Sequence, residues 1–121
     1  MNTTTLTHDI ISSDRVEGTS VYDESGEKLG SIDDLMIDKR SGNVRYAVLE
    51  FGGFLGMGTD RYPMPWQALK YDTTKEGYVV QITKEQLKGA PHFADGDNPV
   101  FTSAYGGQIH DHYGIDKYPG L

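Results

Sequence analysis

The stretch that decides the fold runs from Ser20 to Met64 and reads SVYDESGEKLGSIDDLMIDKRSGNVRYAVLEFGGFLGMGTDRYPM. Runs rich in Ile, Val, Leu and Tyr alternate in it with two similar turn signals, Glu24-Ser25-Gly26 and Arg40-Ser41-Gly42. Apolar runs separated by short glycine-containing turns are typical of consecutive antiparallel strands. The stretch therefore predicts a β-meander.

The alternation of apolar residues slips once within the second predicted strand, roughly residues 28–38. Ile32 lies at an even position, whereas Leu35 and Ile37 lie at odd positions beyond Asp33. An extra residue in one strand, a β-bulge, returns both halves of that strand to the same face. We therefore predict a bulge near Asp33 that leaves Ile32, Leu35 and Ile37 all buried.

The third predicted strand, residues 44–51, is apolar on both faces. Its two sets of alternate residues are Val44, Tyr46 and Val48, and Ala47, Leu49 and Phe51. A strand with one solvated side should have one polar face, so both of these faces need a cover. We expect the first set to fill a barrel. We expect the second set, continued by Phe54, Leu55 and Met57, to form a separate apolar surface.

Short motifs along the chain carry a family resemblance. They are Val21-Tyr22-Asp23, 26–34 (GEKLGSIDD), Ile37-Asp38, 42–48 (GNVRYAV), 51–56 (FGGFLG), Pro65-Trp66, Leu69-Lys70-Tyr71, Gly77-Tyr78 and 87–91 (LKGAP). In these motifs the chain resembles the stand-alone bacterial form of the PRC-barrel domain, over about residues 14–93. The resemblance implies an all-β fold, a small PRC-barrel-like antiparallel β-barrel. From the residue patterns described below we expect in addition a short helix and a helical C-terminal tail.

Three functions stay open, of which the resemblance suggests the first two. The first is a non-enzymatic protein-interaction or adaptor module, because the family has no shared catalytic residues. The second is a peripheral accessory protein of photosynthetic reaction-centre or electron-transfer complexes, by similarity to the cytoplasmic domain of the reaction centre H subunit. The third is a small-ligand binder or enzyme that uses the aromatic region of Trp66 with Tyr62, Tyr71 and Tyr78.

Composition narrows the classes of partner and place of action. The 121 residues suffice for one core, and their net charge of −7 repels phosphate backbones, so we expect no nucleic-acid partner. The absence of cysteine excludes thiol catalysis and disulfides, which suits a reducing cytoplasm. No window approaches the ~20 apolar residues of a membrane span, and no signal peptide is recognisable. We therefore expect a cytoplasmic protein that does not insert into membranes.

Two groups of residues invite a catalytic or nucleotide-binding interpretation and do not fit it. The glycine-rich loop 52–58 lacks the lysine and the following helix of a phosphate loop. Asp33, Asp34 and Asp38 lie on a strand, where neighbouring side chains point to opposite faces. We therefore expect no catalytic and no cofactor-binding residues, and interpret the three carboxylates as bulge and turn residues.

The histidines form the one metal-like group. His110, Asp111 and His112 are close together, with His92 earlier in the chain, and imidazole and carboxylate are zinc ligands. On a helix, residues two apart point in different directions, so His110 and His112 would not share one ion without ligands from elsewhere. We expect no metal site, although the sequence leaves metal binding by His110 and His112 open.

We predict three segments: a flexible N-terminal arm (1–13), a PRC-barrel domain (14–93) and a partly helical tail (94–121). Thr83 and Gln86 form a capping box that starts a short helix before the tail. In the tail, Asn98 and Pro99 read as an N-cap and first helical residue. Phe101, Tyr105, Ile109 and Tyr113 then recur every fourth residue as one apolar helix stripe, which we expect to be interrupted at Gly106 and Gly107.

The second apolar surface and the tail stripe together predict an interaction surface. Its residues are Leu49, Phe51, Phe54, Leu55, Met57, Trp66, Phe101, Tyr105, Ile109 and Tyr113. A monomer would leave this surface exposed to water, whereas two-fold symmetry makes it self-complementary in a dimer. We therefore expect a homodimer, with the tail reaching across it or clasping its rim.

Overall fold

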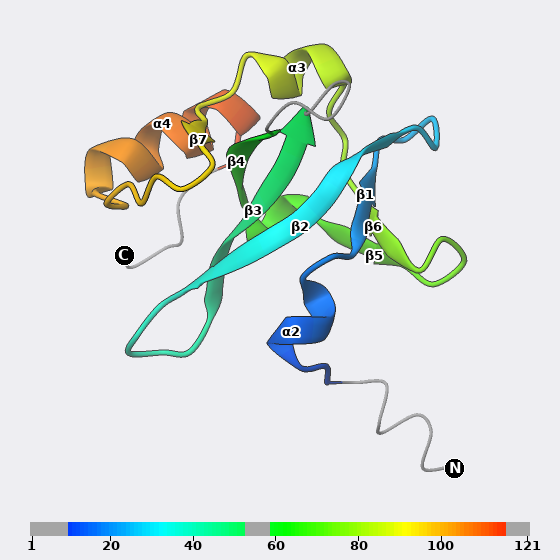
Figure 1. The fold of residues 1–121 in the computed structure, drawn as a ribbon, viewed down its shortest axis with the longest axis horizontal. Coiled ribbons are helices and arrows are strands. Elements are labelled where there is room, and N and C mark those ends of the chain that lie inside the picture. The colour runs from blue at the N-terminus through cyan, green and yellow to red at the C-terminus, as the bar shows by residue number, and fades with distance from the viewer. Residues whose placement is uncertain (1–9, 53–58, 116–121) are drawn as a thin grey trace.

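The computed structural model describes residues 10–52 and 59–115 (Figure 1). Strands dominate it, with a few short helices. Its elements are α2 (Ser13–Val16), β1 (Ser20–Tyr22), β2 (Lys28–Ile37), β3 (Val44–Gly52), β4 (Thr59–Pro65), the 3-10 helix η2 (Trp66–Ala68), β5 (Lys70–Asp72), β6 (Gly77–Val79), α3 (Lys84–Lys88), β7 (Phe93–Ala94) and α4 (Ser103–Tyr113).

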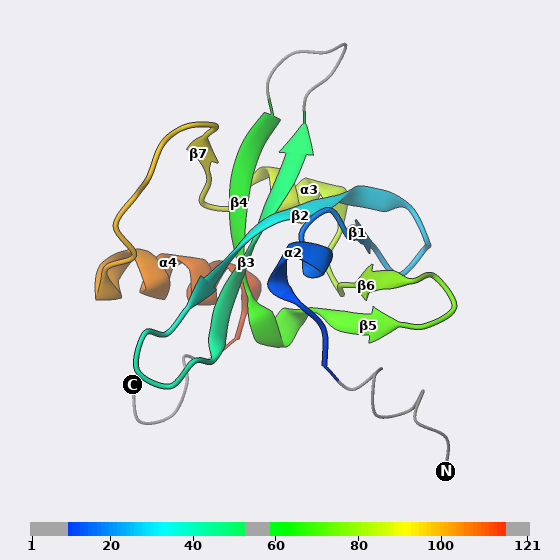
Figure 2. The same ribbon diagram turned by 60° about the horizontal axis from the view of Figure 1, so that its bottom comes forward.

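All of these strands belong to one sheet, in the order β5-β6-β1-β2-β3-β4-β7. β1 to β4 are neighbours in chain order and antiparallel, which confirms the predicted meander. Figure 2 shows the sheet curving strongly, so that β5 and β6 lie away from β3 and β4. The predicted antiparallel barrel is not confirmed. β1 and β6 pair in parallel, and within the described residues no ladder joins β5 to β7, so the sheet stays open.

The predicted bulge in β2 is present at Asp33. Ile32 pairs with Leu49 and Asp34 pairs with Val48, so Asp33 is the extra residue. The prediction that three apolar residues of β2 are all buried is wrong in part: Ile32 is buried, Leu35 is half-buried, and Ile37 is 50% exposed. A second register shift separates Ile37 from the residue before it, where β2 and β3 run beyond β1 as a two-stranded ribbon (Figure 1).

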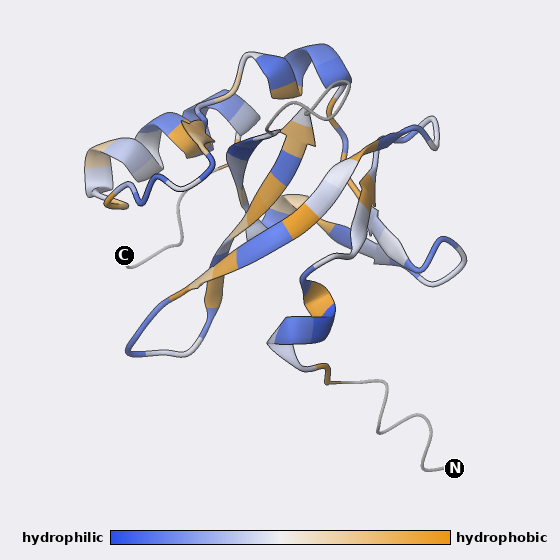
Figure 3. Ribbon diagram, viewed as in Figure 1, coloured by the Kyte–Doolittle hydropathy of each residue, from blue (hydrophilic) through white to orange (hydrophobic). Residues whose placement is uncertain are grey.

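The main core lies on the side of β3 that carries Ala47 and Leu49. Both are fully buried there, among residues from α2, β1, β2, β4, β6 and α3. Tyr46 and Val48 are also buried but lie outside this cluster, on the other side of the strand. The prediction had the two faces exchanged. Figure 3 shows hydrophobic residues along much of β3, and buried residues lie on both of its faces, so alternation alone could not tell which face lies against the core.

Both short helices near the C-terminus have side-chain caps. The capping box predicted at α3 is confirmed, because Thr83 and Gln86 each bond the other's backbone N–H. The predicted start of the tail helix is wrong: α4 begins at Ser103, where the Thr102 hydroxyl accepts the N–H of Tyr105. The expected interruption is also absent, because α4 runs without a break to Tyr113. Among the described helices none is long and apolar enough to span a membrane.

Leu49 tests which side of β3 forms the core. Truncating a fully buried leucine removes apolar contacts and leaves a cavity, so Leu49→Ala should lower the free energy of unfolding by about 2–5 kcal/mol. Urea unfolding followed by circular dichroism measures this change. The control is Ile37→Ala, which removes an exposed side chain and should cost about 0.5 kcal/mol or less. Equal losses in the two variants would contradict the assignment of the core face.

Asp38 makes stability depend on pH through the turn between β2 and β3. The backbone N–H groups of Ser41 and Arg40 donate to Asp38 Oδ1 at 2.9 Å each, and they lower the pKa of this carboxyl from its ordinary value. Because the folded-state pKa is lowered, the ionised carboxyl makes its full contribution to stability above the unfolded-state pKa of about 3.9. That contribution is lost as the pH falls through the folded-state pKa.

Comparison of wild type with Asp38→Ala isolates this contribution, because the other carboxyl groups are common to both. Urea midpoints at pH 7 should differ, with wild type more stable, and the difference should shrink steadily between pH 4.5 and pH 2. A difference that stayed constant over that range would show that the carboxylate form of Asp38 is not what stabilises the turn.

Candidate interaction groove

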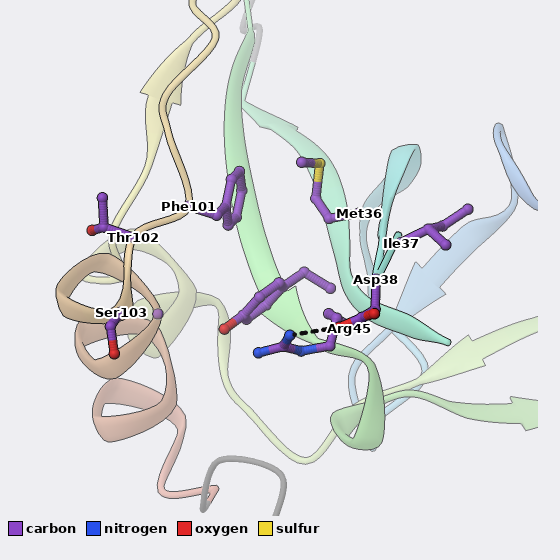
Figure 4. Close-up of a pocket in the computed structure, with 9 residues that line it drawn as sticks. Met36, Ile37, Asp38, Arg45, Phe101, Thr102 and Ser103 are labelled. Atoms are coloured by element: carbon purple, nitrogen blue, oxygen red, sulfur yellow. Dashed lines mark hydrogen bonds and ion pairs between the residues drawn. The ribbon is translucent and has the colours of Figure 1, made fainter. Parts of the chain in front are cut away.

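A groove lies between the ribbon of β2 and β3 and the start of α4. Its volume is about 390 Å³ (Figure 4). The lining residues come from the hairpin of β2 and β3 and from the first part of the tail. They are Met36, Ile37, Asp38, Arg45, Tyr46, Phe101, Thr102, Ser103 and Gly106. It exists because the ribbon leaves the sheet at the second register shift, while α4 packs beside β4.

The charged part of the groove is an ion pair between the residue that follows β2 and a residue of β3. Arg45 Nη1 lies 3.3 Å from Asp38 Oδ2, drawn as the dashed line in Figure 4. The same Asp38 side chain accepts the turn amides through its other oxygen. The turn therefore fixes the carboxylate, and the carboxylate fixes the guanidinium. Both side chains stay about a quarter exposed, so they can still reach polar groups of a ligand.

The apolar part of the groove joins sheet and tail. The ring of Phe101 lies 5.4 Å from that of Tyr46, and the ring of Tyr105 lies 5.2 Å from Phe101. Figure 4 shows Met36 near Phe101, with Ile37 on the outer rim pointing away from them. Ring pairs at these distances are favourable aromatic contacts. The groove therefore has a rigid aromatic wall, a flexible thioether and an exposed aliphatic rim.

The predicted interaction residues do not form one surface. Leu49 is 0% exposed in the main core, so it is not part of any surface of this structure. Phe51 packs edge-on to Tyr62 at 5.3 Å, and Trp66 packs edge-on to Tyr78 at 5.5 Å, both half-buried. Phe54, Leu55 and Met57 lie outside the described residues. In this half of the predicted surface, Leu49 therefore belongs to the core and Phe51 and Trp66 lie at its edge.

The tail half of the predicted surface lies together on α4 and just before it. Ile109 is fully buried, Phe101 lines the groove, the ring of Tyr105 packs against Phe101, and Tyr113 packs against the main core cluster. The tail covers the face of Tyr46 within one chain, whereas Ala47 and Leu49, from whose face a homodimer was predicted, lie in the main core. The oligomeric state itself stays a prediction.

The histidines near the tail engage different partners. His110 is 3% exposed, packs edge-on to the ring of Tyr46 at 5.5 Å, and donates from Nδ1 to the carbonyl oxygen of Ile115 at 2.9 Å. His112 donates from Nε2 to the carbonyl oxygen of Gln86 at 2.7 Å. Over residues 10–52 and 59–115, no three His, Asp or Glu side chains are grouped to hold a metal ion.

A buried arginine ties the start of the tail to the bulge. Arg61 is 9% exposed; its Nε lies 3.0 Å from Asp33 Oδ2, its Nη2 lies 3.1 Å from Asp95 Oδ1, and Nη1 bonds the Thr59 hydroxyl. The three partners come from β2, from the connection after β7 and from β4 itself. Sequence analysis missed this network, because 28 residues separate Asp33 from Arg61 and no local pattern links them.

The carboxylate at the bulge tests this network. Asp33→Ala leaves the mostly buried Arg61 guanidinium short of a partner, so the free energy of unfolding should fall by about 1.5–3 kcal/mol, the range for hydrogen bonds to charged groups. The adjacent Asp34 is exposed and, among the described residues, accepts a hydrogen bond from the N–H of Leu35 alone, so Asp34→Ala should cost less than half as much. Thermal or urea unfolding of both variants decides it. A larger loss for Asp34→Ala would reject the role given to Asp33.

Comparison with known families gives one match. The model of the PRC-barrel domain family matches residues 8–87. The matched part contains β1 to β6 and most of α3, and it leaves β7 and α4 outside. No curated protein matches the chain. The groove is thus formed between strands inside the match and a helix beyond it.

Proposed function

Since the chain belongs to the PRC-barrel domain family, we propose that it is a non-enzymatic protein-interaction module that binds its partner at the groove. The observation that carries this proposal is the groove itself, which Met36 and Phe101 line and whose outer rim carries the half-exposed side chain of Ile37. A concave site with apolar walls and few polar groups suits a projecting side chain of a partner protein.

The chemistry of the groove supports binding rather than catalysis. Its two charged side chains, Asp38 and Arg45, are paired with each other, and the turn amides lower the pKa of Asp38. A carboxyl held in its ionised form is a poor general acid at neutral pH. The pair suits instead the recognition of one polar or charged group beside an apolar anchor. We propose accordingly that the partner presents an apolar side chain flanked by such a group.

The other two hypotheses have less support. Trp66 packs edge-on to Tyr78 and lines neither the groove nor the more open hollow between residues 89–92 and α4, so no observation favours a small-ligand site there. No observation on the described residues favours an accessory role in photosynthetic or electron-transfer complexes. The cytoplasmic location expected from the cysteine-free sequence remains part of the proposal.

Substitution at the groove rim tests the function. Ile37→Asp places a charge where we expect an apolar contact, and it should weaken capture of the partner about tenfold or more, as loss of an interface hot spot does. The full chain, immobilised as wild type and as the variant, is incubated with native lysate, and captured proteins are quantified by mass spectrometry.

The matched control is Ile11→Asp, the same change at an isoleucine that is 61% exposed and does not line the groove. A partner captured by wild type and by Ile11→Asp but lost with Ile37→Asp is the expected result. If every captured protein is retained equally by the two variants, the groove is not the binding site.

A further inference from the structure

α4 covers a second apolar patch on the sheet, which we call the α4 face: Tyr46, Val48, Pro63 and Pro65. Tyr46 pairs with Pro65 and Val48 pairs with Pro63, so the four side chains share one face of β3 and β4. All four are buried, although Tyr46 and Val48 lie outside the main core cluster. α4 lies against β4 and brings the rings of Phe101 and His110 to 5.4 and 5.5 Å from the ring of Tyr46.

The fit between α4 and its surroundings is imperfect in its polar groups. The hydroxyl groups of Tyr105 and Tyr113 and Nε2 of His110 are buried, and none has a hydrogen-bond partner among the described residues. Burial raises the pKa of both tyrosines, most strongly that of Tyr113. A buried polar group without a partner loses its hydrogen bonds to water and gains none in return. Three such groups on one helix oppose its docking.

The sequence of α4 and the exposure of the connection before it also disfavour a firmly docked helix. Gly106 and Gly107 lie inside α4, where glycine loses more backbone entropy than any other residue. The connection from Asp95 to Val100 is exposed at every position except Pro99. The pairing of Asp95 with Arg61 anchors the start of this connection, so α4 can leave while the sheet keeps its own contacts.

We propose that the α4 face is a binding site for an amphipathic helix of a partner protein, and that α4 occupies this site as a replaceable cover. This inference rests on the proposed interaction function and names the partner's chemistry. The partner helix carries an aliphatic residue where Ile109 is buried, a small residue where Gly106 is buried, and Phe in place of Tyr105 and Tyr113. The groove is the end of this site that α4 leaves open, and the family match, which stops before α4, includes the whole α4 face.

Hydrogen exchange of the wild-type full chain tests whether the cover opens. Amides of α4, residues 106–113, should exchange at least tenfold faster than the slowest amides of β3, because α4 opens without global unfolding. If the α4 amides exchange only at the rate of global unfolding, α4 is a permanent part of the fold and the proposal is overturned.

A helix added in trans tests the site itself. The probe is a fluorescent peptide of residues 98–115, and its binding is measured by anisotropy to the full chain carrying Ile109→Asp, which displaces α4. The control chain carries Gln108→Asp, the same added charge at an exposed position of α4. The peptide should bind the Ile109→Asp chain at least tenfold more tightly than the control chain. Equal affinities for the two chains would overturn the proposal.

A second peptide tests the partner's chemistry. It carries Tyr105→Phe and Tyr113→Phe and so removes two hydroxyls that are buried without partners. It should bind the Ile109→Asp chain at least tenfold more tightly than the natural peptide does. Equal or weaker binding would show that these hydroxyls find partners in the complex, and would overturn the stated preference for Phe.

The outcomes separate this inference from the proposed function. If Ile37→Asp abolishes capture while α4 exchanges only by global unfolding, the interaction function stands and the replaceable cover is rejected. Light scattering tests whether a second copy of this chain occupies the α4 face. A wild-type dimer in which the α4 amides exchange more slowly as the protein concentration rises would place a second copy's helix there. That result would also overturn a partner helix as its ligand.

Discussion

The two-faced strand β3 is the constraint on which the rest of this structure depends. Ala47 and Leu49 pack into the core on the concave side of the sheet. Tyr46 and Val48 lie on the opposite face of β3 and are also buried. A sheet with two apolar faces needs two layers of cover. The curved sheet covers the first face together with α2 and α3, and α4 covers the second. The position of the tail, the shape of the groove and the exposed rim at Ile37 all follow from this need.

Much of the fold could be predicted from local signals. The turn sequences gave the meander, the slip in alternation gave the bulge at Asp33, and Thr83 with Gln86 gave the cap of α3. These features depend on residues within a few positions of one another. The predicted start of α4 was wrong because local rules accept both Asn98-Pro99 and Thr102 as helix starts. The helix begins after Thr102 and packs against β4, and this contact is not visible in the local sequence.

The groove could not be predicted, for two physical reasons. Its walls are brought together by the docking of α4, so Met36 and Phe101 meet although more than sixty positions separate them in the sequence. Its rim depends on a second register shift beside Ile37, and no break in the apolar pattern marks that shift, because Met36 and Ile37 are both apolar. The one usable signal was the pair of opposite charges, Asp38 and Arg45, on either side of the turn.

The favourable and unfavourable free-energy contributions to the docking of α4 on the second face are of similar size. Burying roughly three large apolar side chains under α4 stabilises the docked state by about 5–9 kcal/mol. Against this stand two helix-interior glycines at about 1 kcal/mol each and three buried polar atoms without partners at about 1–3 kcal/mol each. The two sums are close, which is the balance that the proposed exchange of α4 requires. A surface that must be covered, with a cover only weakly preferred to its absence, has the energetics of an exchangeable binding site.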